Sequence, residues 1–453
     1  MARFETTSSR PYHLVIFGAS GFTGQFVVEE VARTVSEGPQ GTLKWAVAGR
    51  SKQKLEKVVE QAAGVLGKPE LRSEVDIIVA DVAEPDSLAS MCKQAVIVLN
   101  CVGPYRFFGE PVVKACVENG AHHMDISGEP QFLEGMQLNY NSQAAEKGVY
   151  VIGSCGFDSI PADMGVLYTR DQFKGVLTAV ESFLTIQTGS EGACVHDGTW
   201  QSAIYGFANS QHLQSLRRKF NHKPLPTAGA KLKRSNEIQQ YAVPFIGSDP
   251  SVVKRTQRYL AEEHQATPVQ YGAYAGFGGI GNIIKLMFAG MMFWFLVKFS
   301  FGRNLLIKYP EFFSFGLFTK AGPTRKQVQF QHRGPSFHCE YKKNPLWCLM
   351  VHPVLLVLQL EDSSFQFAFY GEGYTDGQDP SQGKPDGKIR TLVQGPEVGY
   401  VATPIAMVQA ALTLLNEPSA LPKTGGVYTP GAAFAKTTLI DRLNKHGIQF
   451  SVI

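Results

Sequence analysis

A glycine-rich turn between a predicted strand and a predicted helix, near the start of the chain, constrains the fold most. The apolar run at 13–17 leads into Gly18-Ala19-Ser20-Gly21-Phe22-Thr23-Gly24, and a pattern with apolar spacing near 3.6 follows over 22–37. In such a unit Gly18 makes the tight turn, Gly21 lets the backbone approach a pyrophosphate, and Gly24 lets the helix pack on the strand. Ser20, Phe22 and Thr23 offer backbone or hydroxyl donors. The spacing predicts a dinucleotide-binding loop, with a merely structural turn as the alternative.

Short apolar runs and helical patterns alternate from residue 12 to residue 153. The apolar runs are 13–17, 43–48, 75–80, 95–101, 123–126 and 149–152. Strands that are apolar throughout and separated by crossover helices are typical of a parallel, doubly wound sheet that is buried on both faces. We therefore predict an α/β protein in which an N-terminal Rossmann domain spans 12–170, after a flexible N-terminus at 1–11.

The pattern loosens beyond residue 170. Apolar runs at 178–186 and 364–370 predict strands without βα regularity. We expect a second α+β domain over 171–400, inserted before a C-terminal return segment, 401–453, whose helix and tail pack back on the core. The second domain is expected to serve substrate binding or dimerisation, which leaves a homodimer open.

The residues after the second predicted strand indicate which dinucleotide binds. NAD-selective sites place Asp or Glu there to accept from the ribose 2′-hydroxyl. This chain has Arg50 and Ser51 and no acid, and an arginine pairs bidentately with a 2′-phosphate. The sequence favours NADP (NADPH) over NAD, with a surface arginine at a strand end as the plainer alternative.

Other strand ends should complete the cofactor site, because ligands bind beyond the carboxyl ends of the strands in this fold class. Asp81 ends the third predicted strand, where a side chain that contacts adenine usually lies. Asn100, Cys101 and Val102 end the fourth and should approach the ribose and nicotinamide.

Composition excludes several classes of protein. Forty-three Lys and Arg against 39 Asp and Glu give a net charge of +4, without the basic stripe of a nucleic-acid-binding protein. The 7 cysteines show no C-x-x-C pair and no Cys/His ligand spacing, so we expect no metal site and a reducing compartment. The polar N-terminus lacks a hydrophobic secretory segment, so we expect the protein to stay on the cytosolic side and not to be secreted.

An uncharged run, LMFAGMMFWFLV at 286–297, breaks the globular pattern. It is too short to span a bilayer, which needs about 20 residues. It lies in a Phe-rich segment at 283–318, and between 285 and 320 five bases accompany one acid, Glu311. Two interpretations stay open: a buried core helix, or an interfacial segment whose aromatic side chains enter lipid while the bases stay at the headgroups. We favour contact with a membrane.

Six segments make the chain resemble the saccharopine dehydrogenase-like oxidoreductases, which in turn resemble bacterial trans-acting enoyl reductases. They are 18–24, 48–51, 99–105 (LNCVGPY), 124–129 (MDISGE), 156–165 (GFDSIPADMG) and 425–431 (GGVYTPG). The resemblance covers almost the whole chain. It implies an NADP-type Rossmann domain, association with a membrane or a lipid droplet, and a role in glycolipid metabolism, but not saccharopine turnover.

The chain departs from the family pattern in one place. In the family, the strand that matches 364–374 follows 322–327 much more directly, so 328–362 is predicted to be an atypical insertion. The apolar stretch 346–358 within it has no periodic order. Because the insertion enters just before a strand of the second domain, we expect it to impair the substrate site.

Candidate catalytic residues lie near the predicted strand ends. The cofactor carries the hydride chemistry, so the protein must supply a proton donor. The chain has no Tyr-x-x-x-Lys pair, no Gly-x-Ser-x-Gly elbow and no His-Glu-x-x-His. We propose Tyr105 or His196 as the donor, Asp158 as a further catalytic candidate, and Arg106 as an anchor for a polar head group. The plainer alternatives are a helix cap or turn for Asp158 and a hydrogen-bonded surface group for His196.

Three functions follow from these observations. The leading hypothesis is an NADP-dependent oxidoreductase that acts on a lipid-like substrate at a membrane or lipid-droplet surface. The alternative is a non-catalytic protein of membranes or lipid droplets that keeps a Rossmann domain. A soluble amino-acid dehydrogenase of the saccharopine type comes third, because the sequence shows no evident cluster of bases for a dicarboxylic substrate.

Overall fold

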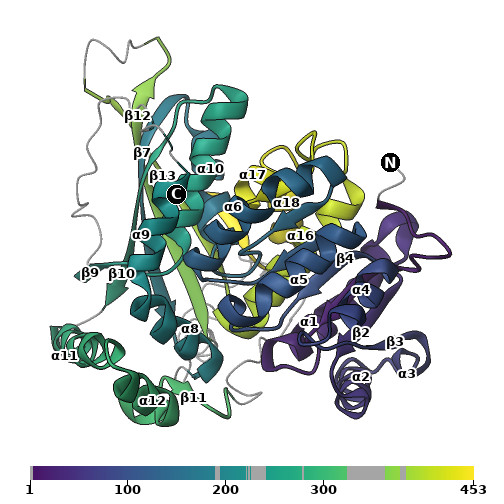
Figure 1. The fold of residues 1–453 in the computed structure, drawn as a ribbon. Helices are drawn as coiled ribbons and strands as arrows, with labels where there is room; N and C mark the ends of the chain where they lie inside the picture. The colour runs from purple at the N-terminus through teal and green to yellow at the C-terminus, as the bar shows by residue number, and fades with distance from the viewer. Residues whose placement is uncertain are drawn as a thin grey trace, which may run out of the picture.

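The computed structural model describes residues 4–188, 194–220, 222, 225, 241–277, 280–323, 363–377 and 384–453. The predicted insertion at 328–362 lies outside the described residues. Two β-sheets stand beside each other with helices around and between them (Figure 1). The N-terminal sheet carries the purple and blue elements, and the second sheet carries mainly the teal and green ones.

A parallel, seven-stranded sheet forms the N-terminal domain, in the order β14-β6-β5-β4-β1-β2-β3. Its strands are β1 (Tyr12–Phe17), β2 (Trp45–Gly49), β3 (Asp76–Val79), β4 (Ala95–Asn100), β5 (His122–Asp125), β6 (Tyr150–Ile152) and β14 (Gly426–Tyr428). Successive side chains of β1, such as Val15 and Ile16, are fully buried on opposite faces. The predicted doubly wound fold is confirmed.

Seven helices connect or flank the strands of this sheet up to residue 172. They are α1 (Phe22–Arg33), α2 (Lys52–Leu66), α3 (Leu71–Glu74), α4 (Pro85–Gln94), α5 (Tyr105–Asn119), α6 (Pro130–Lys147) and α7 (Ile160–Gln172). Helix α1 ends earlier than the pattern at 22–37 suggests. The Thr34 hydroxyl bonds back to the Glu30 carbonyl oxygen at 2.9 Å, and a 3₁₀ turn follows.

From Phe4 onward the N-terminal segment contacts the sheet, and the flexibility expected of 1–11 stays a prediction. The Phe4 ring stacks on His122, with centroids 4.8 Å apart. The Arg10 guanidinium donates to the carbonyl oxygens of Ala95, Asn119 and Gly120 at 2.6–2.9 Å. These groups close the amino-terminal end of the strands, away from the predicted cofactor loop.

The second sheet is mixed, with the order β15-β13-β12-β7-β10-β9. Its strands are β7 (Gly175–Gln187), β9 (Tyr241–Pro244), β10 (Gln270–Phe277), β12 (Ser364–Thr375), β13 (Gly387–Pro396) and β15 (Gln449–Val452). Phe365, Phe367 and Phe369 alternate along β12 and are buried. A Cβ on Gly165 of α7 would lie 2.3 Å from the Phe369 ring, so a glycine is needed where the two domains pack together.

The C-terminal stretch divides between the two sheets. Strand β14 joins the first sheet beside β6, whereas β15 joins the second beside β13. The helices here are α16 (Thr403–Asn416), α17 (Pro430–Phe434) and α18 (Leu439–Lys445). In the part of the chain that the structure describes, one helical stretch, Val398–Asn416, has the length and hydropathy of a membrane span, but 83% of it is buried. Its position is that of a core helix.

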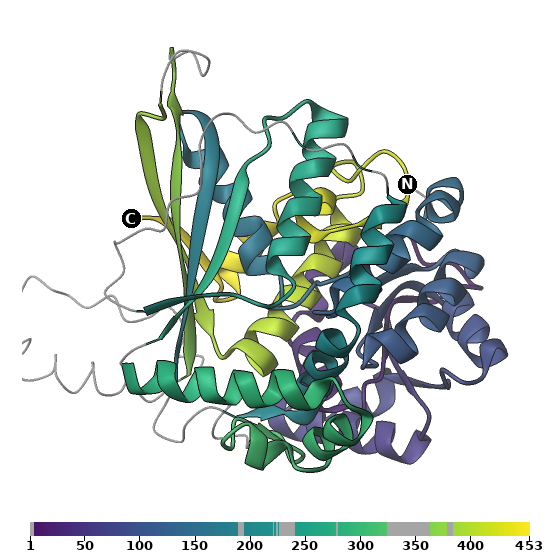
Figure 2. The same cartoon turned by 60° about the vertical axis from the view of Figure 1, so that its left-hand side comes forward.

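A smaller helical group lies at one end of the second sheet, at the bottom of both views (Figures 1 and 2). It comprises α8 (Asp197–Ala208), α11 (Ile280–Val297), α12 (Ser300–Lys308) and α13 (Pro310–Phe313). Strands β8 (Val195–His196) and β11 (Phe318–Thr319) form a two-stranded parallel sheet that ties this group together. Helix α9 (Ser210–Lys219) packs against α6, and α10 (Asp249–His264) packs against α7, α17 and β10.

Candidate functional site

The glycine loop has the backbone geometry that dinucleotide binding requires. Gly18 has φ +83°, and a Cβ there would lie 2.7 Å from a Val102 methyl group. A Cβ on Gly24 would lie 2.2 Å from the Gly18 carbonyl oxygen. Gly21 is the N-cap of α1 and supplies no side-chain acceptor, so the first N–H groups of the helix face outward, together with the positive end of its dipole. The loop is a cradle that larger residues would fill.

The end of β2 presents an unpaired cation next to this loop. Arg50 is exposed, and within the described residues its side chain makes no hydrogen bond or ion pair. The Ser51 hydroxyl accepts from the Lys54 N–H at 3.4 Å and caps α2. A Cβ on Gly49 would lie 3.8 Å from the Ser20 hydroxyl, which shows that β2 ends beside the loop. Arg50 is therefore free to bind a phosphate group.

The ends of β3 and β4 are arranged differently from each other. Asn100 and Val102 lie against the loop: the Asn100 Oδ1 accepts from the Val102 N–H at 3.0 Å. Cys101 donates its N–H to the Phe17 carbonyl oxygen at 2.8 Å, and burial raises the pKa of its thiol to about 12. Asp81 instead accepts from the Ala83 N–H at 3.0 Å, the arrangement of a local turn. Its predicted contact with adenine stays a prediction.

Tyr105 is buried and its hydroxyl is engaged. The Oη donates to the Asn100 carbonyl oxygen at 2.8 Å, and burial raises the pKa of the phenol well above 10.0. Its N–H donates to the Glu129 carboxylate at 3.0 Å, which also accepts from the Ser202 hydroxyl of α8 at 2.8 Å. This geometry suits a group that positions α5 and the end of β4 better than a proton donor.

Asp125 at the end of β5 holds the loops around the site, and our sequence reasoning did not single it out. Its Oδ1 accepts from the N–H groups of Ser127 at 2.9 Å and Ser154 at 3.2 Å. Burial raises the pKa of this carboxyl to about 7, and burial lowers the pKa of neighbouring His123 to about 3. The sequence does indicate Asp125 as a site residue, because it lies in the MDISGE segment and ends a strand.

Asp158 lies on the loop between β6 and α7, near a second carboxyl. Its Oδ2 would be 3.3 Å from a Cβ on Gly128, so the loop after β5 passes directly beside it. Burial raises the pKa of Asp158 to about 6. Burial and the charge of Asp158 raise the pKa of fully buried Asp249 well above 3.8. No local pattern predicts this pair, because Asp249 comes from α10.

His196 lies against the glycine loop, although it is distant in the sequence. Its ring stacks on Phe22, the first residue of α1, with centroids 5.0 Å apart and planes at 21°. The backbone N–H of His196 donates to the Tyr400 hydroxyl at 2.8 Å, and the ring Nδ1 accepts from the Gly198 N–H at 3.2 Å. His196 is thus both a hydrogen-bonded helix cap and a neighbour of the loop, and it brings α8 to the cofactor site.

Helix α11 has an exposed apolar face, which contradicts the core-helix interpretation. Met287, Phe288, Trp294 and Phe295 are 69%, 59%, 56% and 57% exposed. The inner face is packed: the Phe293 ring lies 5.0 Å from that of Trp200. Phe299 and Phe301 at the start of α12, and Phe312 and Phe315 around α13, extend the exposed face. We call these eight exposed side chains, on α11 to α13, the apolar patch.

Bases border the apolar patch. The Lys298 ammonium lies 3.1 Å from the centroid of the Trp294 ring. Arg303 donates to the Val297 carbonyl oxygen at 3.0 Å, and the Lys308 ammonium lies 5.3 Å from the Tyr309 ring centroid. Exposed apolar side chains with cationic side chains beside them are typical of protein surfaces that bind anionic lipid headgroups.

A family model matches the N-terminal domain, and three relatives match nearly the whole chain. Residues 14–152 match the family model described as the saccharopine dehydrogenase NADP binding domain. A human saccharopine dehydrogenase-like oxidoreductase is 59% identical over 454 residues, covering 99% of this chain and 98% of the relative. A Caenorhabditis elegans lipid droplet localized protein is 38% identical over 97% of this chain and 98% of its own length. An Arabidopsis thaliana relative, 36% identical over 98% and 96%, is named "probable mitochondrial saccharopine dehydrogenase-like oxidoreductase".

A solved structure shares the overall fold. Apo saccharopine dehydrogenase (L-Glu forming) from Saccharomyces cerevisiae aligns with a TM-score of 0.52 and 12% identity, over 98% of this chain and 100% of that one. At this identity the similarity shows the fold alone. The Rossmann sheet and the second, mixed sheet therefore form a known two-domain arrangement.

Proposed function

Because this chain belongs to the saccharopine dehydrogenase-like oxidoreductase family, we propose that it is an NADP-dependent oxidoreductase that acts on a lipid-like substrate at a membrane or lipid-droplet surface. The family and its NAD(P)-binding Rossmann domain are the starting point. The choice of NADP, the lipid-like substrate and the surface are our proposal.

A continuous path of contacts from the apolar patch to the glycine loop carries this proposal. Trp200 of α8 packs on Phe293 of α11 and on Phe318 of β11. Strand β11 pairs with β8, where Thr319 lies opposite His196, and His196 stacks on Phe22 of the loop. The exposed apolar surface and the predicted cofactor site are thus neighbours in one packed unit. A substrate that partitions into lipid would reach the site at this end of the molecule.

The described residues fit NADP. Gly18 and Gly24 leave room for the backbone to approach a pyrophosphate, and the first turn of α1 offers N–H donors. Among the described residues, Arg50 has no hydrogen-bond or ion-pair partner to exchange for the 2′-phosphate. When bound, NADPH supplies the hydride, and the chain's own task is to bind the acceptor and donate a proton.

Asp158 is the group that best fits a proton donor. Its raised pKa of about 6 keeps a fraction of the carboxyl protonated near neutral pH. Burial and the charge of Asp158 raise the pKa of the fully buried Asp249 beside it, so the two carboxyl groups oppose being ionised at the same time. Tyr105 already donates its proton to a carbonyl oxygen, and His196 uses one ring nitrogen to cap α8, so these two position the site.

Lipid-dependent oxidation of NADPH tests the proposal. Purified protein is mixed with NADPH and fractionated lipid extracts, and the absorbance of NADPH is followed. Gly21→Asp places a carboxylate where the pyrophosphate is expected and should abolish turnover. Gly64→Asp is a matched control, because a Cβ at Gly64 on α2 meets nothing within 4 Å, and it should keep turnover.

Two outcomes of this assay separate the hypotheses. Turnover that Gly21→Asp loses and Gly64→Asp keeps would support the enzyme. Tight NADPH binding and lipid-surface binding by the wild type, without turnover on any fraction, would favour the non-catalytic alternative.

A further inference from the structure

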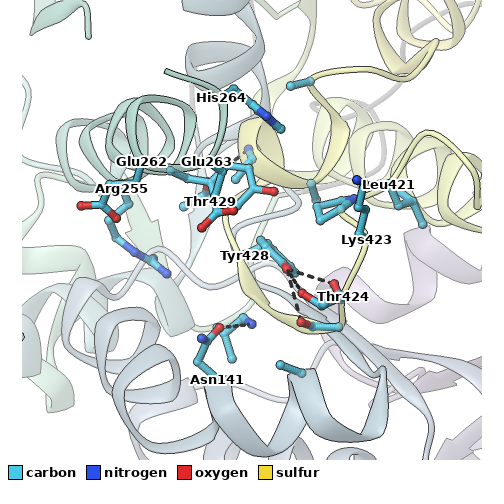
Figure 3. Close-up of a pocket in the computed structure, with 18 of the residues that line it drawn as sticks. Asn141, Arg255, Glu262, Glu263, His264, Leu421, Lys423, Thr424, Tyr428 and Thr429 are labelled. Carbon is cyan, nitrogen blue, oxygen red and sulfur yellow. Dashed lines mark hydrogen bonds between the residues drawn. The ribbon is translucent and has the colours of Figure 1, made fainter. Parts of the chain in front are cut away.

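A polar pocket of about 640 Å³ opens between α10 of the second domain and the C-terminal return segment. Its walls come from α6, α10 and residues 420–436 (Figure 3). The glycine loop and Arg50 contribute no residue to it. In Figure 1, α10 and α17 lie in the upper part of the molecule, whereas α11 and α12 lie at the bottom. The pocket is therefore separate from both the cofactor site and the apolar patch.

Arg255, which lines one side of the pocket, has an incompletely bonded guanidinium (Figure 3). Its Nε donates to the Gln137 Oε1 at 2.8 Å. In the described part of the chain, its Nη atoms donate no hydrogen bond and no carboxylate lies within 4.0 Å. The nearby carboxylates are engaged elsewhere: Glu134 pairs with Arg217 at 2.7 Å, and Asp163 accepts from Thr256 at 2.7 Å. Burial lowers the pKa of Arg255 to about 10, which leaves it charged at neutral pH.

The other charges that line the pocket leave an excess of positive charge. Lys423 and Lys436 form no ion pair with any described residue. Glu262 is already paired with Arg258 at 3.0 Å, which leaves Glu263 as an opposing acid. Among the described residues, three cations without an ion pair thus face one carboxylate without one. In Figure 3, Arg255 and Lys423 lie on opposite sides of the cavity, with Tyr428 between them.

Neutral donors complete the lining. Burial raises the pKa of Tyr259 to about 12, so its hydroxyl keeps its proton at neutral pH. Its ring packs edge-on against Tyr428 at 5.5 Å, which holds it at the wall. The volume lies within the roughly 300–1,000 Å³ that holds a small organic molecule, and is larger than a bare ion requires.

We propose that this Arg255 pocket binds a small, soluble phosphate monoester. An arginine fork pairs with two phosphate oxygens, while lysines act as point charges that neutralise the dianion. The remaining volume takes the organic part, against Tyr259 and Tyr428. Because the pocket shares no element with the apolar patch and lies away from it in Figure 1, its ligand comes from solution and not from a lipid headgroup.

Isothermal titration calorimetry at constant ionic strength tests the proposal, with inorganic phosphate and glycerol 3-phosphate as probes. We expect saturable binding of one molecule per chain, tighter for the monoester. Arg255→Gln should weaken it at least tenfold, since hydrogen bonds to charged groups contribute about 1.5–3 kcal/mol. Lys254→Gln is the matched control: it removes one charge from an exposed site on α10 outside the pocket and should bind as the wild type does.

A second variant and a competition experiment with vesicles test the proposal further. If Arg255→Gln does not fold, Lys423→Gln, an exposed substitution, should weaken binding about two- to fivefold. Vesicles containing phosphatidic acid should not displace glycerol 3-phosphate. The proposal is overturned by the absence of saturable binding of either probe, by equal weakening in Lys254→Gln, or by displacement from the pocket by the vesicles.

Discussion

Arg50→Met isolates the contribution of one side chain to the choice between NADPH and NADH. Arg50 is exposed and has no partner among the described residues, so the substitution breaks no internal contact and the unfolding temperature should stay unchanged. A hydrogen bond to a charged group contributes about 1.5–3 kcal/mol. Because water competes at an exposed site, we take about 1.5–2 kcal/mol, which is roughly ten- to thirtyfold in Kd. NADH lacks the 2′-phosphate, so its Kd should not change.

Fluorescence titration of both nucleotides at low salt measures the two dissociation constants. Arg50→Lys keeps the charge but loses the planar fork, so it should lie between the wild type and Arg50→Met. Lys57→Met removes an exposed base from the next turn of α2 and serves as the control, with both constants as in the wild type. Equal weakening of NADPH and NADH by Arg50→Met would refute the assignment of Arg50 to the 2′-phosphate.

Three other variants test the site and the apolar patch. Asp158→Asn should lower kcat by about 10²–10⁴ and remove the fall in kcat/KM expected above pH about 6; a retained pH profile would exclude Asp158 as the acid. Asp125 has a folded-state pKa of about 7, above its ordinary 3.8, so the unfolded chain loses this proton first and stability falls as pH rises between these values. Asp125→Asn should flatten that fall in thermal unfolding experiments, and an unchanged slope would count against the buried carboxyl. Replacing Phe288, Trp294 and Phe295 together with Ser should weaken sedimentation with anionic vesicles roughly five- to tenfold per aromatic without lowering the unfolding temperature, since these side chains are exposed; undiminished sedimentation would remove the patch from the proposal.

Some of the site was predictable because its signals are local. The turn at Gly18 needs a positive φ, which glycine adopts without strain, and the strand before it and the helix after it follow from their own periodicities. The absence of an acid after β2 is equally local. These features depend on residues that are neighbours along the chain, so no knowledge of the rest of the fold is required.

The roles of the catalytic candidates depend on non-local contacts. Tyr105 and His196 are equally plausible donors in the sequence, but the structure engages one with Asn100 and stacks the other on Phe22. No sequence motif surrounds Asp249, and it becomes a candidate site residue because it lies close to Asp158. Such pairings join segments far apart along the chain, and short-range patterns do not carry that information.

The sequence by itself determined the doubly wound N-terminal domain and the glycine loop, because strand and helix periodicity and glycine conformation act over a few residues. It indicated the family through the resemblance of six short segments. Only the tertiary structure decided that α11 turns an apolar face to solvent, that β14 and β15 divide between two sheets, and that Arg255 faces an open pocket. The apolar run in α11 is hydrophobic on almost every side, so its composition fits a core helix and a surface helix equally well. Burial is set by which elements pack against it, and that depends on the whole chain.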